Sequence, residues 1–227
     1  MRAMAVRGAM IVLLALSVTT AFQMNWFFVT ASAARTEGSA NEGRVFAIQR
    51  NGEDIGRHEV RFERVDGRLN VRINVSVDYR ILFIPVYRFR HEAHEIWDGG
   101  ALKALQATTD DNGESFDVAV KSQGEVLTLH VNGEETDIET SVVPSSLWRQ
   151  VMARTGQMID PADGEVMQVE VEGGEWREIL VRGETIRARH YVMTGGLERE
   201  LWYDSKGLLV KVQFAGEDGS DLQFRLL

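Results

Sequence analysis

The stretch VRINVSVDYRILFIPVYRFRHEAHEIW, Val71 to Trp97, decides the fold class of this 227-residue chain. From Val71 to Phe89 every odd-numbered position is apolar, whereas the even positions are mostly Arg, Asn, Ser and Asp. This alternation is the pattern of a β-strand with one buried face. One straight strand over this length would measure about 90 Å at about 3.3 Å per residue. We therefore expect a turn at Phe83-Ile84-Pro85, because Pro85 lacks a backbone donor.

The chain beyond this stretch also alternates in short apolar runs that turn signals interrupt. These signals are Asn51-Gly52, Asp66-Gly67, Gly99-Gly100, Asp111-Asn112-Gly113, Asn132-Gly133, Gly173-Gly174, Gly195-Gly196 and Lys206-Gly207. The spacing predicts an all-β fold, an antiparallel meander that forms a β-roll or open barrel.

One short helix is expected over about 146–155. Ser145 or Ser146 can cap it, and Leu147, Trp148, Val151 and Met152 recur at helical spacing before Gly156. No Gly-x-Ser-x-Gly elbow surrounds the two serines, so no catalytic nucleophile is assigned.

The amino terminus predicts export. Arg2 and Arg7 accompany an apolar run from Ala9 to Phe22, and Ala31-Ser32-Ala33 is a small-residue cleavage signal. We expect a signal peptide over 1–33, a flexible lead-in over 34–43 and one β-rich domain over 44–227, in the periplasm. An uncleaved signal anchor is the alternative, although two polar residues within 23–25 interrupt the apolar length that a membrane span needs.

The amino-acid composition excludes some classes of binding partner. The chain has no cysteine, so it has neither a disulfide nor a cysteine-linked lipid anchor. Its formal charge is −9, and removal of two arginines with the presequence leaves 23 Lys and Arg against 34 Asp and Glu, or −11. This acidity argues against nucleic acid as a partner and against docking on an anionic membrane face. We expect membrane contact only through an uncleaved anchor.

The HEAH sequence, His91 to His94, resembles a metalloprotease helix motif. In that motif the histidines lie four residues apart on a helix and reach one metal ion. Here they lie three apart on a predicted strand, where side chains alternate between faces, so they point in opposite directions. No metal site and no cofactor are predicted.

The inward face nevertheless carries polar side chains. If the alternation continues past the turn, Tyr87, Phe89, His91, Glu95 and Trp97 share this face, and we expect His58 and His190 to point inward as well, with His94 and His130 outward. These could be separate core histidines with local hydrogen bonds. A binding cleft lined by His58, Tyr87, His91, Glu95, Trp97 and His190 is a second interpretation, and a metal centre is a third.

The outward face of the same stretch carries Arg80, Arg88 and Arg90 beside Asp78 and Glu92. We expect Arg90 to pair with Asp78 across the two strands, as part of a solvated face rather than an anion-binding patch.

The run LFIPVYRFRHEAHEIWDGGALKAL, 82–105, followed by TTDDNG, 108–113, resembles an uncharacterised family of exported bacterial proteins, a domain of unknown function. Gly56-x-His58 and LWYDSKGLLVKVQF, 201–214, are similar too, so the resemblance spans most of 44–227. Ala101 stands where the family often carries a cysteine, which implies that no thiol chemistry is essential there. The closing hairpin is more loosely similar to periplasmic β-roll proteins that include lipoprotein carriers. The resemblance implies an exported all-β protein and brings no reaction.

Two classes of function remain from the sequence. The first is a non-enzymatic envelope protein that binds or scaffolds a lipid, another hydrophobic or polymeric ligand, or an envelope protein. The alternative is a metal-dependent or His/Glu-based enzyme that uses His58, His91, Glu95 or His190 on the inner sheet face.

Overall fold

The computed structural model describes residues 43–154 and 156–227. The predicted signal peptide and the lead-in up to residue 42 lie outside these residues. Within the described part, no helix has the length and apolar character needed to cross a bilayer.

The described residues form fifteen strands and one short 3₁₀ helix. The first eight strands are β1 (Arg44–Arg50), β2 (Glu53–Val65), β3 (Arg68–Ile81), β4 (Ile84–Asp98), β5 (Ala101–Asp111), β6 (Glu114–Gln123), β7 (Val126–Val131) and β8 (Glu134–Glu139). After them come β9 (Val143–Pro144), the 3₁₀ helix η1 (Gln150–Arg154), β10 (Gln157–Ile159), β11 (Val166–Val181), β12 (Glu184–Gly195), β13 (Arg199–Tyr203), β14 (Leu209–Ala215) and β15 (Asp221–Leu226).

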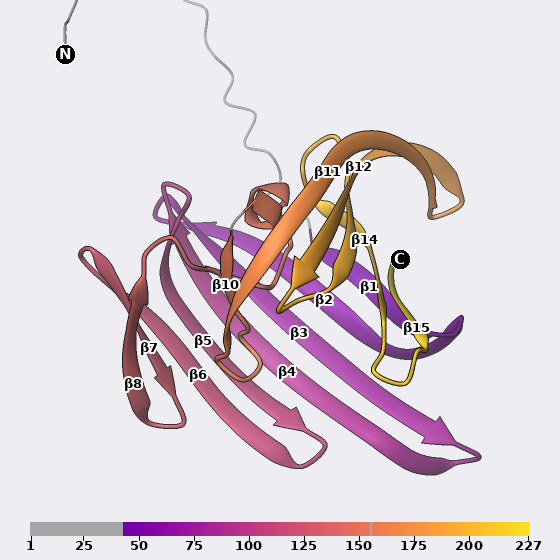
Figure 1. Cartoon of the computed structure of the whole chain (residues 1–227), viewed down its shortest axis with the longest axis horizontal. Helices are drawn as coiled ribbons and strands as arrows, with labels where there is room; N and C mark the ends of the chain where they lie inside the picture. Colours follow the sequence, from indigo (N-terminus) through magenta and orange to yellow (C-terminus); the bar gives the residue numbers. More distant parts are fainter. Residues whose placement is uncertain (1–42, 155) are drawn as a thin grey trace, which may run out of the picture. The chain divides into compact units, whose positions relative to one another are not determined.

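All fifteen strands belong to one sheet in the order β8-β7-β6-β5-β4-β3-β2-β1-β15-β14-β13-β12-β11-β10-β9. Neighbours are antiparallel except β9 and β10. Two meanders are thus joined where β1 pairs with β15 (Figure 1). The strands β8 and β9 remain as the two edges of the sheet. The prediction of an all-β meander that forms an open barrel-like body is confirmed.

The sheet curls because a twisted sheet of this many strands cannot stay open and bury one face. One hydrophobic core draws on both meanders. It includes Leu105 and Val120 from the first half and Met193, Leu201 and Tyr203 from the second. The curled sheet therefore has an interior, and polar residues on its inner face are enclosed.

The stretch from Val71 to Trp97 forms the β3–β4 hairpin, and its alternation is confirmed away from the tip. The turn residues are Leu82 and Phe83, with Ile81 opposite Ile84, so the turn falls one residue before the predicted site. Arg90 still pairs with Asp78 at 2.7 Å, diagonally across the ladder, as predicted.

The helix expected over 146–155 forms only in part, as the 3₁₀ helix η1 over Gln150–Arg154. Leu147 is buried with a positive φ of 52°, which a helix cannot accommodate. The neighbouring backbone is committed to the sheet, because Ser145 N–H donates to Ile159 O and Leu209 N–H donates to Trp148 O. Burial of Leu147 and Trp148 overrides the helical spacing.

The turn expected at Gly173-Gly174 is wrong, because both glycines lie inside β11, where they form a bulge against β12. Gly173 has a φ of 99°, and a Cβ there would lie 2.6 Å from His190 O. Glycine is required by this close approach of two strands.

Candidate functional site

An interior row of side chains crosses five neighbouring strands. Phe46 of β1 is opposite His58 of β2, His58 is opposite Val75 of β3, Val75 is opposite His91 of β4, and His91 is opposite Thr109 of β5. Directly opposed residues share a sheet face, so both histidines point into the barrel. The sequence predicted each orientation, whereas the register shows that they lie in one row.

Gly56 explains why His58 can hold this position. Two residues before His58, a Cβ at Gly56 would collide with the Ser76 carbonyl oxygen of β3. The glycine therefore lets β2 approach β3 unusually closely beside a bulge that shifts the pairing of β1 and β2 after Ile48. This gives the Gly56-x-His58 pattern a physical reason.

His58 is buried, at 6% exposure, and neither ring nitrogen has a hydrogen-bond partner among the described residues. Its ring packs edgewise against Phe46 and Phe224, with centroids 5.7 and 5.3 Å away. Burial, with a smaller contribution from His91, lowers the pKa of His58 to about 4. The imidazole is neutral at pH 7 and offers one donor and one acceptor, both unused.

His91 is also buried and neutral, since burial lowers its pKa to about 4. Its Nδ1 shares a 2.9 Å hydrogen bond with Thr109 Oγ1. Phe89 stacks on its ring. One ring nitrogen of His91 is thus fixed by the protein, which leaves Nε2 as the atom available to a ligand.

The two histidines line an interior cavity of about 200 Å³. Its apolar walls include Ile73, Val75, Leu209, Val212 and Phe224, and Ser146, Asp160 and Arg199 add polar groups from elsewhere in the chain. Burial raises the pKa of Asp160 and lowers that of Arg199 to about 10, and the opposite charge of each partner opposes both shifts. The site is an apolar chamber with a few polar groups, the usual composition of a small-molecule site.

Glu95 belongs to a separate buried cluster on the same sheet face. Its side chain is fully buried, and Oε2 accepts hydrogen bonds from Trp97 Nε1 at 2.7 Å and Trp148 Nε1 at 2.9 Å. The Arg149 guanidinium lies over both indole rings, 5.6 and 4.9 Å from their centroids. Burial raises the pKa of Glu95 against these favourable contacts.

Ser146 links the two clusters. It lines the cavity, and its hydroxyl lies close enough to Glu95 to oppose the rise in that carboxyl's pKa. Even so, Ser146 Oγ and Glu95 Oε1 are buried without a well-formed hydrogen bond among the described residues. The sequence assigned Ser146 only as a helix cap, so this contact was missed.

The cavity brings together His58 and His91, while the other predicted site residues lie elsewhere. Glu95 and Trp97 form the indole cluster. Tyr87 is half-exposed near the β3–β4 tip, opposite Tyr79. His190 does not line the cavity: its Nε2 lies 2.9 Å from Glu200 Oε2 and its ring stacks on Trp202. Along β12 the buried positions change from the even-numbered Ala188 to the odd-numbered Tyr191 and Met193, so the alternation on which the inward prediction for His190 rested does not continue past residue 188.

Asp160, Arg199 and Trp148 were not predicted as site residues. Asp160 follows the short strand β10, Arg199 begins β13 and Trp148 precedes η1, so no local pattern marks them. Only the tertiary fold brings Asp160 and Arg199 to the cavity of the two histidines, and Trp148 to Glu95.

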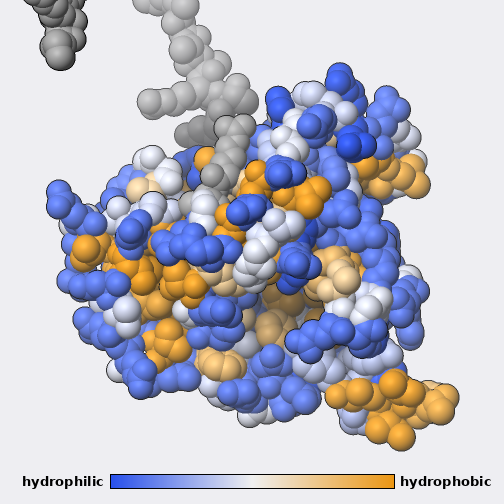
Figure 2. Space-filling view, viewed as in Figure 1, coloured by the Kyte–Doolittle hydropathy of each residue, from blue (hydrophilic) through white to orange (hydrophobic). Residues whose placement is uncertain are grey.

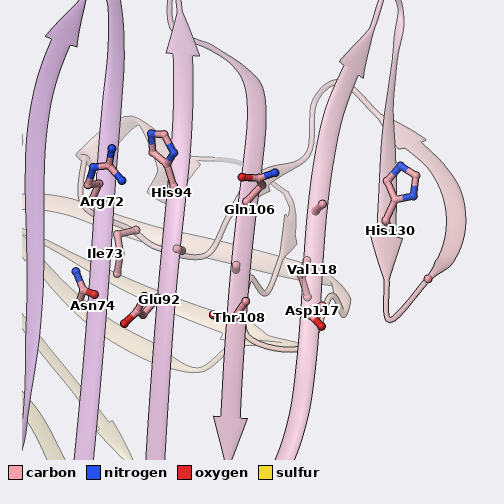
Figure 3. A pocket seen from close by; sticks show the side chains of 14 residues that line it. Arg72, Ile73, Asn74, Glu92, His94, Gln106, Thr108, Asp117, Val118 and His130 are labelled. Carbon is pink, nitrogen blue, oxygen red and sulfur yellow. The ribbon is translucent and has the colours of Figure 1, made fainter.

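A larger groove of about 500 Å³ lies on the outer face of β3–β7 (Figure 3). Arg72, His94 and Gln106 form one row, with Asn74, Glu92, Thr108 and Asp117 in a second, and His130 stands at the far end. His94 and His130 therefore point outward, away from His91, as the strand alternation predicts. His94 Nε2 is 2.9 Å from Asn70 Oδ1, and His130 faces Glu135 at 3.5 Å. Both histidines of the groove have partners, whereas His58 in the interior cavity has none among the described residues, so the interior cavity is the stronger candidate.

Metal-ligand geometry is absent from the described residues: no three His, Asp or Glu side chains converge on a point that could hold an ion. The cavity histidines thus offer hydrogen bonds rather than a three-ligand site.

Comparisons with known proteins give the family and the fold. The family model for a domain of unknown function, DUF6134, matches residues 46–227. No curated protein matches the chain. A solved structure, a beta-barrel-like protein of domain of unknown function DUF1849 from Brucella abortus, is similar with a TM-score of 0.59 at 9% identity. The similarity covers 83% of this chain and 96% of that one, which supports the barrel-like fold alone.

Proposed function

From the premise that this chain belongs to the DUF6134 family of domains of unknown function, we propose that it is an exported, non-enzymatic binding protein for a small amphiphilic ligand. The ligand would occupy the interior cavity with its apolar part and bond to His58 with a neutral polar group. Export is supported by the basic, apolar and small-residue order of residues 1–33.

The observation that carries the proposal is the buried, unpartnered imidazole of His58 on the cavity wall. Leaving a buried polar group unsatisfied costs about 1–3 kcal/mol. A ligand hydroxyl, amide or protonated carboxyl would satisfy it. Because both cavity histidines are neutral at pH 7, they do not select an anion.

Cavity size limits the ligand. A volume of 200 Å³ corresponds to about six or seven water molecules at their share of liquid volume, ~30 Å³ each. That space suits a short aliphatic chain with one polar end, or the end of a longer chain that passes Asp160 and Arg199.

Titration with hexanol, followed by the ¹⁵N resonances of the imidazoles, tests this assignment. We expect saturable binding that shifts His58 and His91 but not the outer-face His130. His58→Phe should abolish binding, whereas the matched surface variant His130→Phe should keep it. Absence of saturable binding, or equal binding by His58→Phe, would contradict the proposal. If hexanol binds as expected, native mass spectrometry of protein isolated without chelators would identify the natural ligand.

The second candidate, a His/Glu-based enzyme, is favoured by one observation: Glu95 Oε1 and Ser146 Oγ are buried and unsatisfied beside the cavity. The variant His91→Ala separates the two functions. If the chain is a binding protein, this variant should have a lower melting temperature, because its core packing is loosened, and an unchanged metal content. An enzyme should keep a near-normal melting temperature and lose its activity or its metal ion.

A further inference from the structure

The tip of the β3–β4 hairpin exposes a continuous group of large apolar side chains. Leu82 and Phe83 are 86% and 92% exposed, and Ile81, Ile84 and Val86 beside them are also exposed. In Figure 2 this tip is the orange patch at the lower right, at the ends of β3 and β4 in Figure 1. Water-exposed apolar clusters of this kind mark interaction sites.

The backbone conformation of the tip indicates that its large apolar residues serve a function. Leu82 and Phe83 both have positive φ, 48° and 72°, as the two central residues of a type I′ turn require. Bulky side chains are disfavoured in this conformation, which Asn-Gly and Asp-Gly adopt readily. Elsewhere the same chain uses those favourable pairs, at Asn51-Gly52, Asp66-Gly67, Asn112-Gly113 and Asn132-Gly133. Only at this tip are both glycine-favouring positions of a hairpin given to large apolar residues, among the described hairpins.

The order of residues away from the tip matches the depth profile of a bilayer. Aliphatic side chains and Phe83 come first, with Arg80 beside them opposite Pro85. The opposed pair Tyr79 and Tyr87 follows, and Arg88 and Arg90 lie farther from the tip. Tyrosine favours the membrane interface, and arginine reaches phosphates from just above the apolar region.

Charges around the tip argue for apolar insertion rather than electrostatic docking. Arg88 is paired with Asp110 at 2.6 Å and Arg90 with Asp78 at 2.7 Å. Arg80, next to Ile81, makes no ion pair within the described residues and is exposed. One arginine is thus available to a lipid phosphate, while the acidic body gives no general attraction to an anionic surface.

We propose that the β3–β4 tip is a membrane-insertion device, which places Leu82, Phe83 and their aliphatic neighbours in the outer part of a phospholipid bilayer. The contact is independent of residues 1–33 and of the interior cavity, and it adds a second membrane contact to the one that the sequence led us to expect, through an uncleaved anchor alone. A protruding two-stranded ribbon with apolar side chains around its end suits a deformable lipid layer, which can surround it.

A local fluorescent reporter tests the proposal in the full chain. The chain has no cysteine, so Ile84→Cys provides a single attachment point for an environment-sensitive dye. With vesicles of phosphatidylcholine and phosphatidylethanolamine, we expect brighter, blue-shifted emission that brominated lipid quenches, with little dependence on salt. A reporter at Leu180→Cys, an exposed apolar position on β11, is the matched control and should not respond.

The double change Leu82→Asn with Phe83→Gly supplies the decisive variant, because it installs a favourable type I′ turn and leaves the fold intact. We expect the lipid response of the reporter at position 84 to fall at least about tenfold, since the variant lacks two apolar side chains that would be buried in the bilayer. An unchanged response in this variant, or no response in the parent, would overturn the proposal. A response that appears without lipid as protein concentration rises would assign the tip to contact between copies and would overturn it too.

Discussion

At the scale of single residues, the molecule contains buried groups whose ionisation opposes folding, the histidines as pH falls and Glu95 as pH rises. His58 and His91 have pKa values lowered by burial, and Glu95 has a raised one. In each case burial disfavours the charged form of the side chain, so the folded state favours the neutral form. Stability of the fold therefore depends on pH through a few identifiable side chains.

The two histidines should make the protein less stable as pH falls. Unfolded histidine binds a proton near pH 6.5, whereas the folded pKa values are about 4, so the unfolded state binds more protons between these values. The free energy of unfolding should fall by up to about 3 kcal/mol per histidine from pH 6.5 to 4. Urea unfolding at several pH values measures this, and His58→Phe should have a visibly smaller slope. Equal slopes would show that His58 is not buried in its neutral form.

Glu95 should have the opposite dependence, because its raised pKa means that the folded state holds the proton longer. Its stabilising effect is complete below the unfolded pKa and is lost as pH rises through the folded pKa. Glu95→Gln removes this titration and keeps an acceptor for Trp97 and Trp148. In this variant the free energy of unfolding should therefore no longer decline as pH rises. Glu95→Leu leaves two indole N–H groups unpaired and should cost about 3 kcal/mol. Comparable stability of the Leu and Gln variants would contradict the role of these hydrogen bonds.

At the scale of elements, the β3–β4 hairpin is predicted to sacrifice stability at its tip. The change Leu82→Asn with Phe83→Gly should raise the free energy of unfolding by about 1–2 kcal/mol, because positive φ then suits both residues. Thermal and urea unfolding check this, with Leu180→Asn as a surface control of near-zero effect. A destabilised double variant would show that the exposed apolar side chains contribute to packing.

The elements also show where sequence reasoning succeeds. Alternation from Val71 to Trp97 predicted the hairpin, because only period two buries one face of a strand. It failed at Gly173-Gly174, where the same residue type that ends strands instead forms a bulge. It also failed for the first half of 146–155, since helical spacing of apolar residues cannot reveal burial of Leu147 and Trp148 against the sheet.

At the scale of the whole molecule, the pairing of β1 with β15 joins two meanders into one sheet. Removal of 221–227 should abolish cooperative unfolding, because β1 and β14 each lose one of their two neighbouring strands and Phe224 no longer closes the cavity. Tryptophan fluorescence, to which the buried Trp97, Trp148 and Trp202 contribute, is compared with far-UV circular dichroism to check whether one transition remains. As a control, a flexible replacement of Glu134 to Glu139 removes only the polar edge strand β8 and should preserve it. A cooperative truncated protein would show that the meanders fold independently.

The sequence by itself determined the all-β class, the alternation of strand faces and the inward direction of His58, His91 and Glu95. These properties depend on local geometry, in which side chains alternate along a strand and turns need particular residues. Only the tertiary structure decided that His58 and His91 share one row and one cavity, that Glu95 lies between two indoles, and that His190 is elsewhere. Register between strands and the curl of the sheet depend on contacts between residues far apart in the chain, which no local pattern encodes.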